Sequence, residues 1–220
     1  MIQPDEIIRS NRKTLSISVD SFGKLTVRAP MHCGEERIFA FLREKEAWIL
    51  RKQKERAAFG IQPPPENLDG YTLLILGKEY TLSLIDGSKI GLNTERGILY
   101  LPKKNAQARL VRWLKENAKR ILTAVTAQTA ERMGTSFRSV TITSARSRWG
   151  SCAYDNALRY SFRLLYAPKE VVEYVTVHEL AHTKHKNHSK AFWTEVAKYC
   201  PDWKEKRNWL KRHSALMQLF

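Results

Sequence analysis

Residues 178–182 read His-Glu-Leu-Ala-His, an H-E-x-x-H motif. In a helix, residues i and i+4 lie on one face about one turn apart, so the two histidines can reach one zinc ion at about 2.0–2.1 Å each. Glu179 directly follows the first histidine, where its carboxylate can accept a proton from water without binding the metal. The motif predicts a zinc site with His178 and His182 as ligands and Glu179 as the general base.

The surrounding sequence supports a helix around this motif. Apolar residues recur through it at helical spacing, at Val171, Val172, Val175 and Leu180. Proline suits the first turn of a helix, so we expect this one to run from Pro168 to about Thr183. Four of the six histidines of the chain lie within eleven residues here, which favours a metal site over a chance match.

A third zinc ligand has three candidates. His185 would lie about 10.5 Å further along a continuous helix than His178, which is too far for one metal ion. His188 can return to the metal if the helix ends soon after His182 and the chain turns at residues 184–187. That spacing is the one used by metzincin proteases, whose motif has glycine where this chain has His185. Glu195, on the next predicted helix, is the gluzincin-style alternative. The spacing favours His188, with Glu195 and then His185 behind it.

Turn and periodicity signals organise the rest of the chain. They predict a hairpin at 13–29, a helix at 35–58, a proline-rich linker at 60–70, strands at 71–76, 79–85 and 97–101, a long helix at 105–133, a strand at 137–144, and helices at 189–199 and from 202 onward. The fold class is therefore α+β. We expect a β-rich N-terminal part with one helix at 1–101 and a catalytic domain at 102–220.

Composition sets the range of possible partners. The 220 residues carry a formal net charge of +16, spread along the whole chain, and such a surface attracts nucleic acid by its charge alone. Three widely spaced cysteines, with no C-x-x-C pair, predict free thiols. The chain shows no secretory signal and no apolar run of membrane-spanning length. We therefore expect a soluble cytoplasmic protein without a membrane partner.

Three further stretches carry a family resemblance. They are Arg148-Trp149-Gly150-Ser151-Cys152, the segment 174–182 that contains the zinc motif, and Asn187-His188-Ser189 with Phe192-Trp193. The ending Pro201-Asp202-Trp203, with Trp209-Leu210, fits as well. With these motifs the chain resembles the YgjP-like family of predicted zinc metallopeptidases over nearly its whole length. That family is distantly similar to the SprT-like proteases, which act on proteins crosslinked to DNA.

The resemblance implies a zincin-like domain, in which a small antiparallel sheet lies over the active-site helix. The segment 146–163 would supply the strands above the metal, and the edge strand would pair with an extended peptide. Arg148 and Trp149 would then line the cleft as substrate-binding residues. Phe192 and Trp193 fit better as core residues that back the metal helix.

The leading hypothesis is a zinc-dependent peptidase that acts on proteins or peptides. Arg148, Tyr160 and Tyr166 are candidates for stabilising the oxyanion of the reaction. One alternative is a basic nucleic-acid-binding protein with a structural zinc. Structural sites commonly have four protein ligands and often cysteine, which fits three histidines and a glutamate less well. The other alternative is a protease recruited to DNA by its basic surface.

Overall fold

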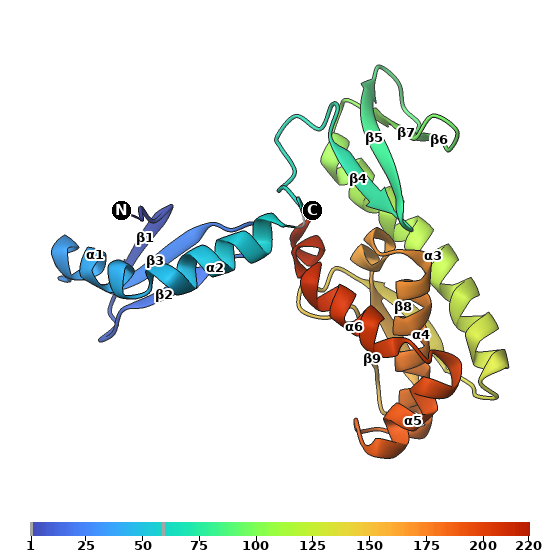
Figure 1. Cartoon of the computed structure of the whole chain (residues 1–220). Coiled ribbons are helices and arrows are strands. Elements are labelled where there is room, and N and C mark those ends of the chain that lie inside the picture. The colour runs from blue at the N-terminus through green and yellow to red at the C-terminus, as the bar shows by residue number, and fades with distance from the viewer. Residues whose placement is uncertain (1, 59) are drawn as a thin grey trace. The chain divides into compact units, whose positions relative to one another are not determined.

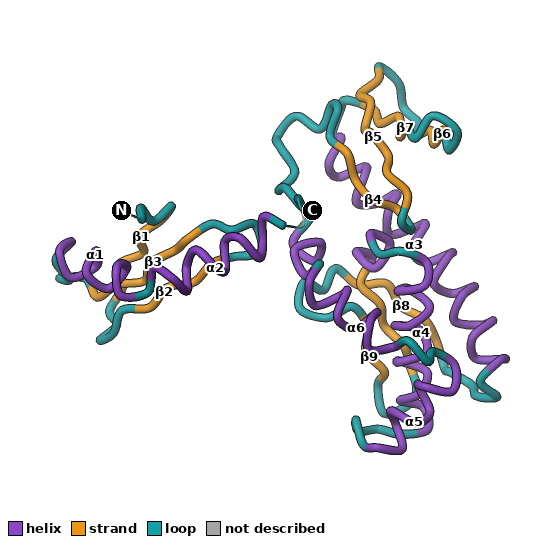
Figure 2. Tube along the Cα trace, in the orientation of Figure 1, coloured by secondary structure: helices purple, strands orange, loops and turns teal. Residues whose placement is uncertain are grey.

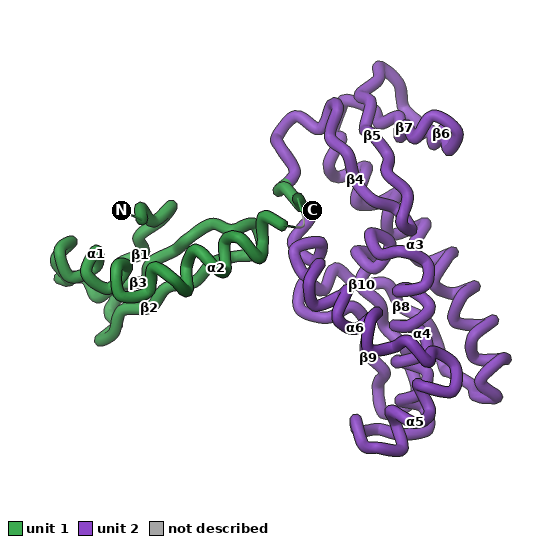
Figure 3. Tube along the Cα trace, viewed as in Figure 1, with its two compact units in different colours: residues 1–63 green, residues 64–220 purple. Residues whose placement is uncertain are grey.

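The computed structural model describes residues 2–58 and 60–220 (Figure 1). The chain forms two compact units, Met1–Pro63 and Pro64–Phe220, which Figure 3 shows in green and purple. The division falls inside the proline-rich segment 60–70 that the sequence marks as a linker. It differs from the boundary at residue 101 that we expected, because the strands between 64 and 101 belong to the second unit.

The first unit is a three-stranded sheet with two helices. Its elements are β1 (Glu6–Ser10), β2 (Ser16–Val19), β3 (Leu25–Pro30), α1 (Glu35–Glu44) and α2 (Glu46–Ala57). The predicted hairpin is confirmed as the antiparallel pair β2 and β3, and β1 adds to β3 in parallel. Apolar residues of β3, α1 and α2 form the core of this unit. We expected one helix over 35–58; instead the helical backbone breaks at Lys45, with φ −97° and ψ 7°.

A four-stranded sheet opens the second unit. Its order is β4-β5-β7-β6, from β4 (Thr72–Ile75), β5 (Lys78–Ile85), β6 (Gly91–Asn93) and β7 (Ile98–Pro102). The backbone N–H of Leu76 donates to the carbonyl of Leu165 at 2.7 Å. Gly77, at φ +80°, packs its backbone closely against Pro168. These contacts attach the sheet to the second unit and explain why the compact units do not divide at residue 101.

The second sheet of this unit lies beside the metal helix. It has the order β8-β10-β9, from β8 (Ser139–Thr143), β9 (Gly150–Cys152) and β10 (Ala157–Ser161). We expected an antiparallel sheet, but only β9 and β10 are antiparallel, whereas β8 and β10 are parallel. The reason is the path of the chain: it passes from β8 to the far edge, forms β9, and turns back so that β10 lies between them.

Helices cover one face of this sheet. The long helix α3 (Ala106–Arg132) contacts β8, and α4 (Lys169–Lys184) contacts β9. Along the strands, buried Val140, Leu158 and Tyr160 alternate with exposed Thr141 and Arg159, as expected for a sheet with one covered face. The α+β fold predicted from the sequence is confirmed, and Figure 2 shows its helices and strands in different colours.

The remaining elements complete the helical part. They are the 3-10 helix η1 (Phe162–Tyr166), α5 (Lys190–Tyr199), α6 (Trp203–Arg212) and the 3-10 helix η2 (Ser214–Gln218). Ser189 caps α5, since its side chain accepts a hydrogen bond from the backbone N–H of Phe192. Among the described residues, no helix combines the length and apolar character needed to cross a membrane.

Candidate metal centre

Three histidines meet at the C-terminal end of α4. The helix stops after Lys184, His185 takes an extended conformation, and the following turn carries His188 back over the helix. The Nε2 atoms of His178 and His188 are 3.1 Å apart, and one ring nitrogen from each of His178, His182 and His188 lies within 4.8 Å of the others. Two nitrogen ligands of one tetrahedral zinc ion would be separated by about 3.3 Å. The spacing of the three side chains therefore suits a single metal ion.

The two other candidate ligands lie elsewhere. His182 Nδ1 donates to the backbone carbonyl of His185 at 3.0 Å, so His185 contributes its backbone and not its ring. This bond fixes the orientation of the His182 ring and leaves Nε2 free as a ligand. The Glu195 carboxylate accepts hydrogen bonds from Lys184 at 2.8 Å and Lys198 at 3.1 Å, and the Lys184 bond chiefly holds the Glu195 pKa below its usual value.

Aromatic side chains surround the histidines. Phe192 is fully buried, and its ring centroid lies 4.5–4.9 Å from all three imidazole centroids. Trp193 stacks on His188 at 5.6 Å and on Trp203 at 4.1 Å. Phe192 and Trp193 thus support the imidazoles from α5, whereas Trp203, on α6, is a supporting residue that the sequence analysis missed. The separation of Trp193 and Trp203 along the chain gives no signal of that contact.

The surroundings of His178 keep its imidazole neutral. Burial lowers the pKa of His178 to about 3, and the nearby His182 and His188 lower it further in the same direction. A neutral imidazole is the form that binds a metal ion. Three imidazoles with no protein carboxylate among them match the donor set of catalytic zinc sites. The residues present therefore fit the metal that the sequence motif predicts.

Glu179 lies against the edge strand of the sheet. Its side chain packs on the backbone of Gly150 in β9, where a Cβ atom would stand only 2.6 Å from Oε1 and 2.8 Å from Cγ. Only glycine lets the strand and this carboxylate approach so closely. Glu179 is 6% exposed, and burial raises its pKa to about 8. The residue that the motif marks as a base is therefore desolvated and positioned by β9.

The residues expected to contact substrate fall into two groups. Arg148 is exposed on the loop before β9, and Trp149 is half-buried beside it. Tyr160 and Tyr166 are fully buried, which takes both away from any substrate in this structure. Of the three candidates for the oxyanion, only Arg148 is accessible. All three cysteines are free, as predicted.

The comparisons with known proteins agree with this arrangement. A family described as "YgjP-like, metallopeptidase domain" matches residues 13–213, which includes the whole H-E-x-x-H helix and the turn to His188. The protein is therefore a metallopeptidase, a hydrolase that acts on peptides. Within that class it belongs to the YgjP-like family, and the resemblance seen in the sequence is confirmed.

Two solved structures are similar to part of the chain. The metallopeptidase zymogen abylysin of Pyrococcus abyssi is 22% identical, with a TM-score of 0.38 over 41% of this chain and 93% of that chain. The metallopeptidase zymogen jannalysin of Methanocaldococcus jannaschii is 20% identical, with a TM-score of 0.35 over 40% of this chain and 94% of that chain. No curated protein matches the chain.

Proposed function

We propose that this metallopeptidase uses zinc, held by His178, His182 and His188, with Glu179 as the general base. The observation that supports this most is the convergence of three imidazole nitrogens within 4.8 Å of one another, next to a desolvated carboxylate. Imidazole suits zinc, and three protein ligands leave a position open for chemistry. A structural zinc would ordinarily have a fourth protein ligand, which makes that alternative the weaker one.

The chain's own residues have defined tasks in the proposed reaction. When bound, zinc supplies a Lewis acid that makes water nucleophilic near neutral pH and polarises a carbonyl group. Glu179 accepts a proton from water and passes it to the leaving amine. Burial alone raises the pKa of Glu179 to about 8, and a divalent cation beside it would favour the charged form that can accept a proton.

The free edge of β9 is the proposed place for the peptide. In the order β8-β10-β9, this strand pairs on one side only among the residues that the structure describes, and an extended peptide can add to such an edge by backbone hydrogen bonds. Gly150, in the same strand, touches Glu179, so a peptide on β9 would lie beside the base. Arg148 and Trp149 immediately precede the strand, which supports their assignment as substrate-binding residues.

Metal content and activity together test this function. Purified protein should contain about one zinc ion per chain, as expected for a single three-ligand site. It should hydrolyse an unfolded protein such as reduced casein, lose that activity with a strong chelator, and regain it with zinc. Elemental analysis and a fluorescent casein assay measure both. Activity that persists in metal-free protein would rule the proposal out.

A substitution at Gly150 tests whether β9 positions the base. The backbone of Gly150 does not need glycine, so Gly150→Ala should fold, but its Cβ must displace the Glu179 carboxylate. We expect unchanged zinc content and a kcat lower by roughly 10²-fold, the effect of misplacing a reacting group by about 1 Å. Gly91→Ala is the matched control, because its Cβ would meet only ordinary contacts at 3.6 Å or more. Wild-type kcat in Gly150→Ala would contradict the assignment.

Recruitment to DNA and a cytoplasmic location remain predictions from the sequence. The net charge of +16 supports the first, since a basic surface binds polyanions in a salt-dependent way. A gel-shift titration at several salt concentrations tests it independently of peptidase activity.

A further inference from the structure

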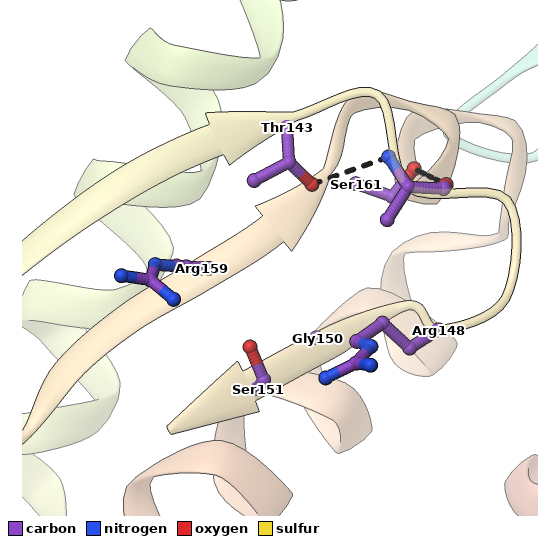
Figure 4. A pocket seen from close by; sticks show the side chains of 7 residues that line it. Thr143, Arg148, Gly150, Ser151, Arg159 and Ser161 are labelled. Carbon is purple, nitrogen blue, oxygen red and sulfur yellow. Dashed lines mark hydrogen bonds between the residues drawn. The ribbon is translucent and has the colours of Figure 1, made fainter. Parts of the chain in front are cut away.

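A pocket lies beside the edge strand β9, on the outer face of the sheet. It has a volume of about 200 Å³ and opens on the face of the β8-β10-β9 sheet opposite to the metal helix (Figure 4). Because side chains alternate along a strand, Ser151 points away from the side on which Gly150 meets Glu179. Ser151 is the register partner of Arg159 in β10, so the two side chains share this outer face. The pocket and the base are therefore on opposite sides of the same strand.

The lining of this pocket is positive. Arg148 and Arg159 contribute two guanidinium groups, and Thr143, Ser151 and Ser161 contribute hydroxyl groups, with no carboxylate among the lining residues. Neither arginine takes part in an ion pair found among the described residues. By contrast Arg138, in the adjoining part of the same face, pairs with Asp155. Asp155, which lines the adjoining pocket together with Arg159, is already paired with Arg138. Two arginine side chains outside any such ion pair suit an anion such as a carboxylate or a phosphate.

Two hydrogen bonds from core residues hold the start of the loop that carries Arg148. Arg163 is 2% exposed and donates from Nη1 to the carbonyl of Ser144 at 2.9 Å. Ser161 Oγ donates to the carbonyl of Ala145 at 2.8 Å. The start of the loop is thus fixed to the core, which reduces the conformational entropy that this part of the chain would lose when a ligand binds beside it.

The position of the pocket indicates which anion it takes. A peptide added to the free edge of β9 would alternate its side chains between the metal side and the outer face. Those on the outer face would lie next to Ser151 and within reach of the long Arg148 and Arg159 side chains. We propose that the pocket binds an aspartate or glutamate side chain of the substrate, so that the enzyme prefers peptides with an acidic residue close to the scissile bond. This inference rests on the proposed function.

A charge-swap experiment on the zinc-loaded enzyme tests the preference. One peptide sequence is made with Glu, Gln or Lys at each position around the cleavage site, and kcat/KM is measured for each. We expect Glu to exceed Gln by roughly tenfold, the gain typical of a partly exposed charged hydrogen bond, at alternating positions only. Arg159→Glu should reverse the preference, so that the Lys peptide is cleaved with the highest kcat/KM. Arg148→Gln should reduce the preference for the Glu peptide. The double variant Arg138→Gln with Asp155→Asn, which removes an existing ion pair from the same face without changing the net charge, should leave the ratio unchanged.

Binding gives a readout that does not depend on hydrolysis. Fluorescence anisotropy with the same labelled peptides and Glu179→Gln protein should show the same Glu over Gln preference. Charge-selective binding without hydrolysis by the wild type would support the pocket while refuting the proposed function. Hydrolysis with equal kcat/KM for the Glu, Gln and Lys peptides would overturn the pocket. A preference for the Glu peptide that survives both arginine substitutions would overturn the proposed pocket too. So would an oligonucleotide that binds at the pocket while the peptides show no charge preference.

Discussion

Replacing Glu179 by glutamine should leave the protein folded and zinc-loaded while lowering peptide hydrolysis by at least 10²–10⁴-fold, the usual loss for a general base. Glutamine keeps the size of the buried side chain, so its contact with Gly150 can persist, but its amide cannot accept the proton. Casein hydrolysis, zinc content and the melting temperature of the two proteins measure the three expectations separately.

Glu173→Gln is the matched control for this variant. It removes the same charge from an exposed position of the same helix, α4, and should keep full activity. Any affinity for nucleic acid should survive in both variants, since each removes only a negative charge. An active Glu179→Gln enzyme would refute the proposed mechanism and leave the metal site standing.

Replacing His188 by alanine should weaken zinc binding by more than about 100-fold, beyond the loss typical of residues that only support a ligand. His178→Ala or His182→Ala should have effects at least as large. His185→Ala should matter little, because the carbonyl that holds His182 belongs to the backbone. Competition with a chromogenic zinc chelator measures all four affinities.

Glu195→Ala is the variant that can contradict this ligand set. It should lower the melting temperature, since it removes the carboxylate that pairs with Lys184 and Lys198, but zinc affinity should stay within a few-fold of the wild type. If zinc affinity falls as far as in His188→Ala, the site is gluzincin-like and the spacing argument for His188 is wrong.

The helix and its histidines could be predicted because their signals are local. The spacing of His178 and His182 fixes a common helix face, and the residues between His182 and His188 suit a turn, which the structure shows. The long helix 105–133 was equally accessible through its apolar stripe and the stop at Gly134, which adopts φ +57°. Such features depend on residues near one another in the sequence.

Contacts between distant segments left no comparable signal. Nothing in the sequence around Gly150 indicates that this position needs a glycine, and only the packing of β9 on α4 shows that a side chain there would clash with Glu179. The carbonyl of His185 orients the ring of His182, but a backbone carbonyl is present at every residue, so the sequence cannot mark this one as important. The parallel pairing of β8 with β10 was missed because the intervening edge strand has only three residues, Gly150–Cys152.

If a peptide pairs with β9 as proposed, the contact between Gly150 and Glu179 would couple substrate binding to the position of the base. A peptide that pairs with β9 exerts force on the backbone of that strand. Because the Glu179 carboxylate packs against the strand at Gly150 without an intervening side chain, a shift of β9 would move this carboxylate directly. The alignment of the carboxylate would then depend on how well a peptide fits the edge, so that poorly seated chains are cut slowly even when they reach the metal.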